Sequence, residues 1–150
     1  MIEDISKYPF LFGYDIPFLD PTETWLDAVP DGWKKIFLEF CDKIVEILEK
    51  YDMPAAKVSI NTIKEKFGEL RVYFDFHHLN PMAIREIQDA NYNMMEKSRV
   101  ICYDCGEPAV YQSNGWILPF CEKCAVSYLQ KTNENHKTNF TLSQLFDKIN

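Results

Sequence analysis

The clearest hydrophobic pattern in the chain lies between residues 31 and 51. Apolar residues recur there at spacings of three and four positions, with charged residues between them. This is the period of an α-helix that buries one face. The apolar positions are Trp33, Ile36, Phe37, Phe40, Cys41, Ile44, Ile47 and Leu48. We expect Asp31 to be the N-cap and the helix to end near Tyr51, before Pro54. Cys41 is then a buried thiol on the apolar face.

The next segment changes to a period of two, which is typical of strands with one buried face. The apolar positions are Val58, Ile60 and Thr62 in the first run, and Leu70, Val72, Phe74 and Phe76 in the second. Phe67 and Gly68 lie between the runs, so we predict an antiparallel hairpin with Gly68 in the turn. Residues 82–98 then predict a second helix, weakened by Asn91 and Asn93.

The two ends of the chain are less regular. Residues 1–30 contain four prolines among aromatic and aliphatic residues, which predicts an extended segment over the core with a turn of helix near 22–28. A helix is expected from Ala125 to about Lys131, followed by a polar loop over 132–138. Thr141 and Gln144 have capping-box spacing and introduce a predicted amphipathic C-terminal helix.

Together these elements predict an α+β fold. A long helix packs on an antiparallel β-hairpin, a second helix follows, and a C-terminal four-cysteine zinc ribbon completes the chain. With 150 residues, we expect a single domain. Its parts are an extended segment (1–30), a helix-hairpin-helix core (31–98), the ribbon (100–125) and a helical segment (126–150).

The charge is distributed unevenly along the chain. The net charge is −7, and the first fifty residues hold eleven Asp and Glu against five Lys. Such a chain has no general attraction to phosphate backbones. Its acidity favours either plain solubility or an acidic face that docks on a basic partner, such as a nucleic-acid-binding protein. No apolar run has the ~20 residues of a membrane span, and the acidic N-terminus does not resemble a signal peptide. A cytoplasmic protein without membrane contact is expected.

Four cysteines carry the strongest chemical signal. Cys102 and Cys105 form one pair, Cys121 and Cys124 form another, and fifteen residues separate the pairs. Each turn aims two sulfurs at one point, and two such turns complete the tetrahedral site that zinc prefers. Two short strands are expected around Ser113, Asn114 and Gly115. We predict one structural zinc ion per chain; two disulfides, an iron–sulfur centre and a dithiol redox pair are the alternatives.

Catalysis is not predicted. The zinc site looks closed, without an open coordination position. A nucleobase deaminase needs a His-x-Glu element and a Pro before its second cysteine pair, but His77-His78-Leu79 lacks the Glu and Phe120 precedes Cys121. Residues 106–120 contain no histidine, which excludes a histidine-metal nuclease motif between the pairs. We see no nucleophile–base constellation and no phosphate-binding glycine loop, so an enzyme is the least favoured class.

The segment 64–73, Lys-Glu-Lys-Phe-Gly-Glu-Leu-Arg-Val-Tyr, is the second unusual feature. It is consistent with an ordinary charged hairpin tip. It could also form a contact surface for phosphate or an acidic partner, to which an exposed aromatic residue of the ribbon would add stacking. The candidate partner-binding residues are Lys64, Lys66, Arg71, Tyr73 and Trp116.

This segment, the Asp-Gly-Trp helix start at 31–33 and the ribbon at 102–124 together resemble a group of uncharacterised small zinc-ribbon proteins encoded by bacteriophages and prophages. The resemblance covers roughly residues 31–125 and implies a phage setting and a zinc ribbon, but no activity. A phage setting makes the bacterial cytoplasm the expected location. It favours small inhibitors of host machinery or host defence.

Two functions follow as expectations. The first is a non-enzymatic phage accessory protein that binds a host protein, inhibiting a defence or nucleic-acid enzyme, with the acidic N-terminal third supplying the docking charge. The second is a nucleic-acid-binding zinc-ribbon protein. Its candidate contacts are Lys64, Lys66, Arg71, Lys97, Arg99 and Lys123.

Overall fold

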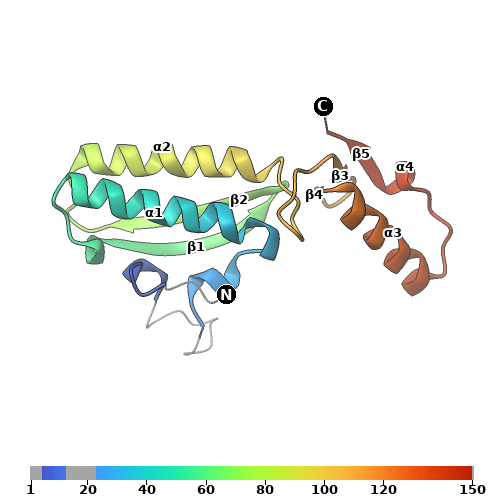
Figure 1. Cartoon of the computed structure of the whole chain (residues 1–150), viewed down its shortest axis with the longest axis horizontal. Helices are drawn as coiled ribbons and strands as arrows, with labels where there is room; N and C mark the ends of the chain where they lie inside the picture. Colours follow the sequence, from blue (N-terminus) through green and yellow to red (C-terminus); the bar gives the residue numbers. More distant parts are fainter. Residues whose placement is uncertain (1–4, 13–22, 150) are drawn as a thin grey trace.

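The fold is α+β, as predicted, and consists of a helix–hairpin body with a ribbon at one end (Figure 1). The computed structural model describes residues 5–12 and 23–149. Residues 1–4 and 13–22 of the predicted extended segment therefore lie outside the described residues. The helices and turns are η1 (Pro9–Leu11), η2 (Trp25–Ala28), η3 (Asp31–Trp33), α1 (Lys34–Lys50), η4 (Ala55–Lys57), α2 (Pro81–Ser98), α3 (Glu122–His136) and α4 (Leu142–Leu145). The strands are β1 (Val58–Lys66), β2 (Glu69–Phe76), β3 (Tyr111–Ser113), β4 (Pro119–Phe120) and β5 (Phe146–Lys148).

The long helix α1 buries the face that the pattern predicts. All seven of its predicted apolar positions from Ile36 to Leu48 are buried. Its start differs from the prediction, because Asp31 opens the short turn η3 and Trp33 is the N-cap residue of α1. The Asp31 carboxylate does not cap a backbone amide of α1. It pairs instead with the Lys34 ammonium at 3.1 Å.

The hairpin forms between the two predicted runs, but its inner face changes halfway along β1. Val58 and Ile60 face the core opposite Phe76 and Phe74. A β-bulge between Ile60 and Thr62 then shifts the register, so that Ile63 lies opposite Val72 and packs on the core. The sequence prediction placed Thr62 on this face and was wrong there, since a bulge adds one residue and reverses the alternation.

Side chains of helix α2 form hydrogen bonds with backbone groups at the edge of β2. The Ser98 hydroxyl accepts a hydrogen bond from the Leu70 amide at 2.8 Å, and the Asn91 side chain donates to the Val72 carbonyl at 2.8 Å. An unpaired backbone group at a buried sheet edge is costly. This explains Asn91, a poor helix former, in the middle of a helix that spans Pro81–Ser98.

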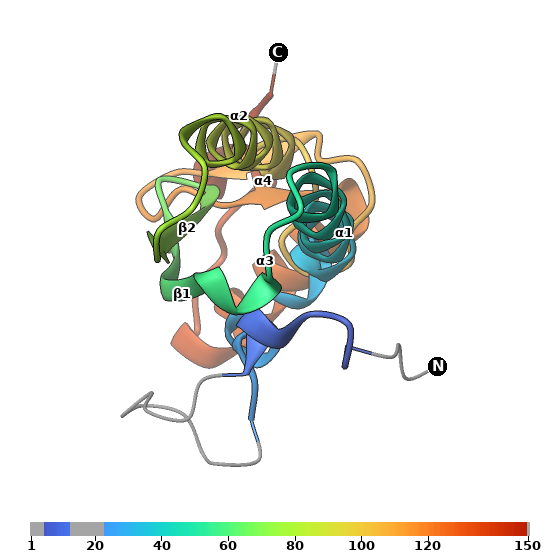
Figure 2. The same ribbon diagram turned by 90° about the vertical axis from the view of Figure 1, so that its left-hand side faces the viewer.

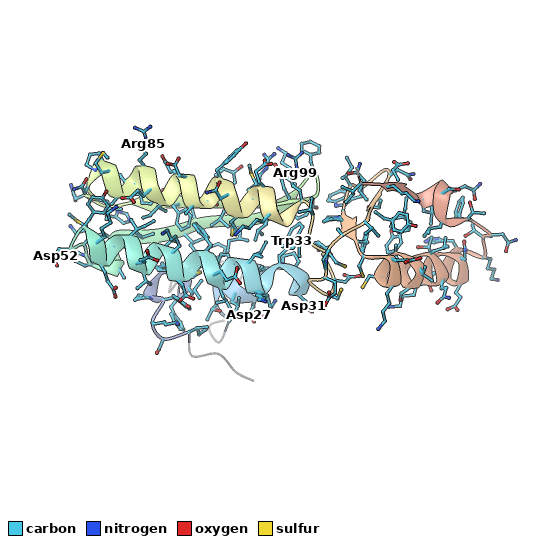
Figure 3. The ribbon with its side chains drawn as sticks, turned by 45° about the horizontal axis from the view of Figure 1, so that its top comes forward. Asp27, Asp31, Trp33, Asp52, Arg85 and Arg99 are labelled. Atoms are coloured by element: carbon cyan, nitrogen blue, oxygen red, sulfur yellow. The ribbon has the colours of Figure 1, made fainter. Side chains whose placement is uncertain are left out.

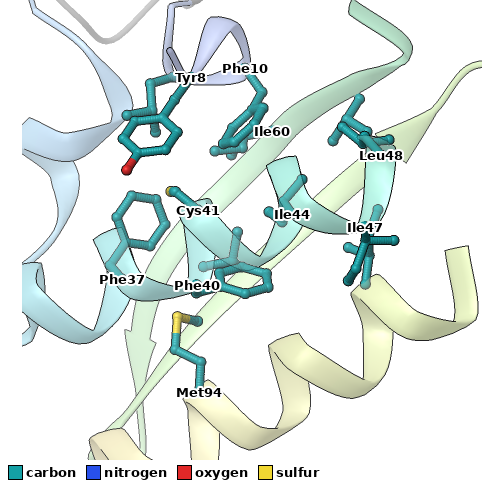
Figure 4. Close-up of a cluster of buried hydrophobic side chains, with 14 of the residues drawn as sticks. Tyr8, Phe10, Phe37, Phe40, Cys41, Ile44, Ile47, Leu48, Ile60 and Met94 are labelled. Carbon is teal, nitrogen blue, oxygen red and sulfur yellow. The ribbon is translucent and has the colours of Figure 1, made fainter. Parts of the chain in front are cut away.

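Residues 5–12 of the N-terminal segment contribute to the core. Viewed end-on, they lie beside β1 on the side of the body away from α2 (Figure 2). Tyr8, Phe10 and Leu11 are buried, and Tyr8 and Phe10 point toward Cys41 and Ile60 (Figure 4). The Tyr8 hydroxyl donates a hydrogen bond to Asp42 on α1. Burial together with this bond raises the pKa of Tyr8 to about 12.

The C-terminal part departs most from the prediction. Helix α3 continues to His136, through the predicted polar loop, and ends at Lys137 in the left-handed conformation. The capping box at Thr141 and Gln144 forms, but α4 is a single turn. The chain then becomes β5, which pairs antiparallel with β3. A free edge of β3 and a buried position for Phe146 favour this strand over a longer helix.

We expect the two asparagines of α2 to respond differently to alanine. Asn91→Ala removes the bond to Val72 and should lower the free energy of unfolding by about 1 kcal/mol. Asn93→Ala, an exposed position on the same helix, should be neutral or slightly stabilising, because alanine is the better helix former. Urea denaturation of both variants measures the difference. Equal effects would show that the bond to Val72 contributes nothing.

Candidate metal centre

Two tight turns bring the four predicted cysteines together. The first turn, residues 102–106, is closed by backbone hydrogen bonds from the Gly106 amide to the Cys102 carbonyl and from the Cys102 amide to the Glu107 carbonyl. The second turn is the start of α3, where Cys121 is the N-cap and its sulfur accepts a hydrogen bond from the Cys124 amide. Among the described residues, these four are the group of side chains that could hold a metal ion.

The spacing of the sulfurs fits a metal rather than disulfides. The four sulfur atoms lie within 4.8 Å of one another, and Cys105 and Cys121 are 3.6 Å apart. Four sulfurs around a tetrahedral zinc, each at ~2.3 Å, lie ~3.8 Å apart, whereas a disulfide bond measures ~2.05 Å. All five cysteines of the chain are unbridged. Cys41 lies apart from this group, buried in the body, where burial raises the pKa of its thiol.

The pKa shifts of the clustered thiols indicate that a bound cation would stabilise their ionised forms. Burial disfavours ionisation of Cys102, but amide hydrogen bonds from Cys121, Cys105 and Asp104 outweigh it and hold the pKa of this thiol below its usual value. Burial and the neighbouring sulfurs raise the pKa of Cys124. Ionisation of one thiol therefore opposes ionisation of the next, because like charges repel at this distance. A divalent cation at the centre would remove that repulsion and stabilise all four thiolates.

The first cysteine turn is packed directly against the start of the long helix. The Gly32 amide donates to the Tyr103 carbonyl at 2.9 Å, and the buried Trp33 indole donates to the Ile101 carbonyl at 3.0 Å. Trp33 lies at the end of the body that faces the ribbon (Figure 3). A Cβ atom on Gly32 would lie 1.9 Å from the Cys102 carbonyl oxygen. Only glycine lets the two backbones approach this closely.

Aromatic side chains continue this contact into the ribbon. The Tyr103 ring meets Trp33 edge-on, with centroids 5.3 Å apart, and its other neighbour is Phe120 at 6.4 Å. Phe120 in turn packs edge-on against Phe146 of β5. The ribbon cluster has four fully buried members, one of which is the ligand Cys102: Cys102, Phe120, Ala125 and Phe146. A metal ion held by the cysteines would add stability to so small a cluster.

A second contact joins the ribbon to the tip of the hairpin. The strands β3 and β4 flank a loop that carries Trp116, whose indole donates to the Glu65 carboxylate of β1 at 2.7 Å. Gly68 lies against Ile117, where an added Cβ would be 3.1 Å from that side chain. The other Glu65 oxygen accepts a hydrogen bond from the Gly68 amide. Glu65 therefore holds both the hairpin turn and the ribbon loop.

The candidate partner-binding residues fall on two neighbouring surfaces. Lys64 and Arg71 lie opposite each other on the outer face of the hairpin, with Tyr73 beside them and Lys66 near the turn. Trp116 is 75% exposed and reaches the same tip through Glu65. The structure thus brings Trp116 and the hairpin tip together, which periodicity alone did not predict.

Two further residues of this region were not predicted as functional. Glu69 is nearly buried, and its carboxylate pairs with Arg71 at 2.6 Å and with Arg99 at 3.5 Å. Phe67 is 67% exposed and has a left-handed backbone with φ 55°. Phe67 could have been recognised from the sequence, because an apolar residue stands before the turn glycine where Asn is usual.

Comparisons with known proteins identified no relative of this chain: no protein-family model, curated protein or solved structure matches it. Within residues 5–12 and 23–149, no helix has the length and apolar character needed to cross a membrane.

Gly32→Ala should separate the ribbon from the body. Overpacking of this kind costs about 1–3 kcal/mol, and here backbone atoms form both sides of the clash. We expect a lower melting temperature and faster hydrogen exchange at the Trp33 indole and in residues 102–106. Gly115→Ala is the control, because an added Cβ there would have no neighbour within 4 Å; its positive φ of 78° strains the alanine backbone but causes no clash with the first cysteine turn. Equally fast indole exchange in both variants would argue against the close contact at Gly32.

The metal centre has its own test. The purified protein should contain one divalent ion per chain, and Cys105→Ser should reduce that content, because a hydroxyl is a poor replacement for a thiolate ligand. Cys41→Ala should keep one ion per chain. Removal of the ion by a chelator should accelerate hydrogen exchange in residues 100–125 more than in α1. Elemental analysis and exchange mass spectrometry measure both effects, and a metal-free native protein would contradict the assignment.

Proposed function

We propose that the chain is a non-enzymatic, zinc-stabilised accessory protein of the bacteriophage type, which binds a protein of the bacterial host and inhibits it. The single observation that carries this proposal is the exposure of two aromatic side chains at the junction of hairpin and ribbon: Phe67 in the hairpin turn, and Trp116, whose indole is hydrogen-bonded to Glu65 two residues before Phe67. Exposed aromatic residues of this kind are typical anchors of protein interfaces.

Zinc is the metal that the donor set supports best. Four thiolates form a soft, closed, tetrahedral set, which suits zinc and leaves no coordination position for a substrate. Among the described residues, the remaining histidines have other surroundings; His77, for example, shares a hydrogen bond with Ser59 at 2.9 Å. The ion would hold the ribbon against the body and would take no part in chemistry.

The hairpin turn supports a binding role through its strain. A two-residue turn with positive φ at both positions is best made by Asn-Gly, yet the chain has Phe67 (φ 55°) and Gly68 (φ 79°) there. A bulky residue in the left-handed region costs about 1–2 kcal/mol. Exposure of the ring gives no compensating burial. Strain without a benefit to stability is typical of functional positions.

Part of the charge of the acidic N-terminal third is compensated within that third. Three of its carboxylates are paired with lysines of the same third, in the pairs Asp31–Lys34, Asp42–Lys7 and Glu46–Lys43. The remaining field of these groups is therefore weak at physiological salt. We place the docking surface at the tip of the hairpin instead, and define the tip surface as Lys64, Lys66, Phe67 and Trp116.

Nucleic-acid binding is the second candidate. The Lys64 ammonium lies 5.3 Å from the centroid of the Tyr73 ring, and Lys66 lies 5.6 Å from that of Phe67. Alternating cations and exposed rings are also used to bind single strands.

We expect Phe67→Asn to change stability and partner binding in opposite directions. It should raise the melting temperature, because asparagine relieves the left-handed strain, and it should weaken partner binding, because the anchor is lost. Tagged zinc-loaded protein would be mixed with nuclease-treated bacterial lysate, and the retained proteins measured by mass spectrometry. We expect one stoichiometric partner on the wild type, strongly reduced on Phe67→Asn and Trp116→Ala.

Met82→Ala is the matched control, since Met82 is 55% exposed at the far end of α2. It should retain the partner fully. Equal retention by all variants would remove the tip surface from the proposal. Retention of nucleic acid alone from untreated lysate would promote the second candidate.

A further inference from the structure

The positive charge on the tip surface comes from two lysines, which flank the Glu65 carboxylate that accepts hydrogen bonds from Trp116 and Gly68. Lys64 and Lys66 are exposed, and neither forms an ion pair within the part of the chain that the structure describes. Each ammonium lies near an aromatic ring instead, Lys64 beside Tyr73 and Lys66 beside Phe67. A partner that brings carboxylates to this surface would meet two unneutralised cations.

The neighbouring arginines do not add to this charge. Arg71 and Arg99 share the nearly buried carboxylate of Glu69, and Arg99 also contacts Glu96 at 3.3 Å. Two guanidinium groups are thus compensated by two carboxylates. The positive charge open to a partner is therefore confined to Lys64 and Lys66, at the end of the outer face that borders the ribbon.

The apolar anchors beside the lysines are oriented in advance. The indole of Trp116 is held by Glu65, and the Phe67 ring lies beside the Lys66 ammonium on a turn whose backbone is set by the hairpin. Anchors that are already ordered lose less conformational entropy on binding. The ring faces left exposed require a partner with bulky apolar side chains, because a purely acidic chain would not cover them.

A shallow hollow of about 290 Å³ lies next to these anchors, between the hairpin tip and the ribbon. It is lined by Phe67, Gly68, Arg99, Gln112, Ile117 and Pro119. Binding pockets for small molecules usually enclose about 300–1,000 Å³. This hollow is at the lower limit and suits a side chain of a partner protein better than a separate ligand.

Charge also distinguishes a protein partner from a nucleic acid. Binding to a phosphate backbone gains its strength from the number of phosphates neutralised, and only two lysines are free for this at the tip. The chain as a whole carries −7, which repels a long polyanion. A short acidic segment experiences mainly the local field, because charges beyond about 8 Å are screened at physiological salt.

We infer that the tip surface binds an acidic protein segment that carries bulky apolar side chains. Its carboxylates pair with Lys64 and Lys66, its apolar side chains cover Phe67 and Trp116, and one of them enters the hollow beside Arg99. This inference rests on the proposed protein-binding function and names the chemistry of the partner.

Selection of random displayed peptides on the zinc-loaded full chain tests it. Selected peptides should be rich in Asp and Glu together with aromatic residues or leucine. Their dissociation constants, measured by fluorescence anisotropy, should rise at least about tenfold for K64E/K66E, since like charges then face each other. Trp116→Ala should raise them about thirtyfold, as loss of an aromatic anchor does.

The matched control is K35E/K131E, which makes the same change of charge at two exposed lysines of α1 and α3. It should bind the peptides as the wild type does. Selected peptides that are neutral or basic, or acidic peptides that bind K64E/K66E as tightly as the wild type, would overturn the inference. Binding of single-stranded oligothymidylate that is lost in K64E/K66E, with no peptide selected, would overturn it in favour of nucleic acid.

The two proposals can fail separately. A lysate partner that is lost with Trp116→Ala but retained by K64E/K66E would refute the acidic chemistry and leave protein binding in place. Absence of both peptides and a lysate partner would refute protein binding itself.

Discussion

The close contact between Gly32 and the first cysteine turn is the constraint on which the rest of the structure depends. Two backbones meet there at a distance that excludes even one Cβ atom, and the hydrogen bonds of Gly32 and Trp33 join them. This contact sets the position of the ribbon relative to the long helix. The cysteine cluster lies directly behind it, so an ion bound there stabilises the joint and the ribbon together.

The joint matters because the hairpin tip and the ribbon loop are far apart in sequence but share one surface. Trp116 reaches Glu65 only if the ribbon is held in place, and Gly68 packs on Ile117 under the same condition. The ribbon's own buried cluster is small, whereas the body has a much larger core that includes the N-terminal segment. A metal ion bound by the cysteine cluster at the joint would therefore stabilise a surface that neither part forms alone.

Charge and strain are arranged on that surface in a way that stability does not require. Glu69 compensates two arginines from a nearly buried position, so that two lysines remain as the free cations. Phe67 occupies a conformation that favours asparagine or glycine, with its ring in solvent. Both features reduce stability or leave it unchanged. This arrangement is the basis for the proposal that another molecule covers the tip.

Sequence alone determined the features that arise from local chemistry. The helical period of α1, the strand alternation of β2 and the paired cysteines follow from side-chain spacing, so the α+β class and the metal ligands could be predicted. Tertiary structure decided the remainder. The bulge before Thr62, the strand β5 in place of a longer helix, the role of Asn91 and the pairing of Trp116 with Glu65 all depend on partners distant in the chain. A periodic pattern indicates which face is buried, but it does not identify the distant hydrogen-bond partner: a backbone carbonyl for Asn91, the edge of β3 for β5 and a carboxylate for Trp116.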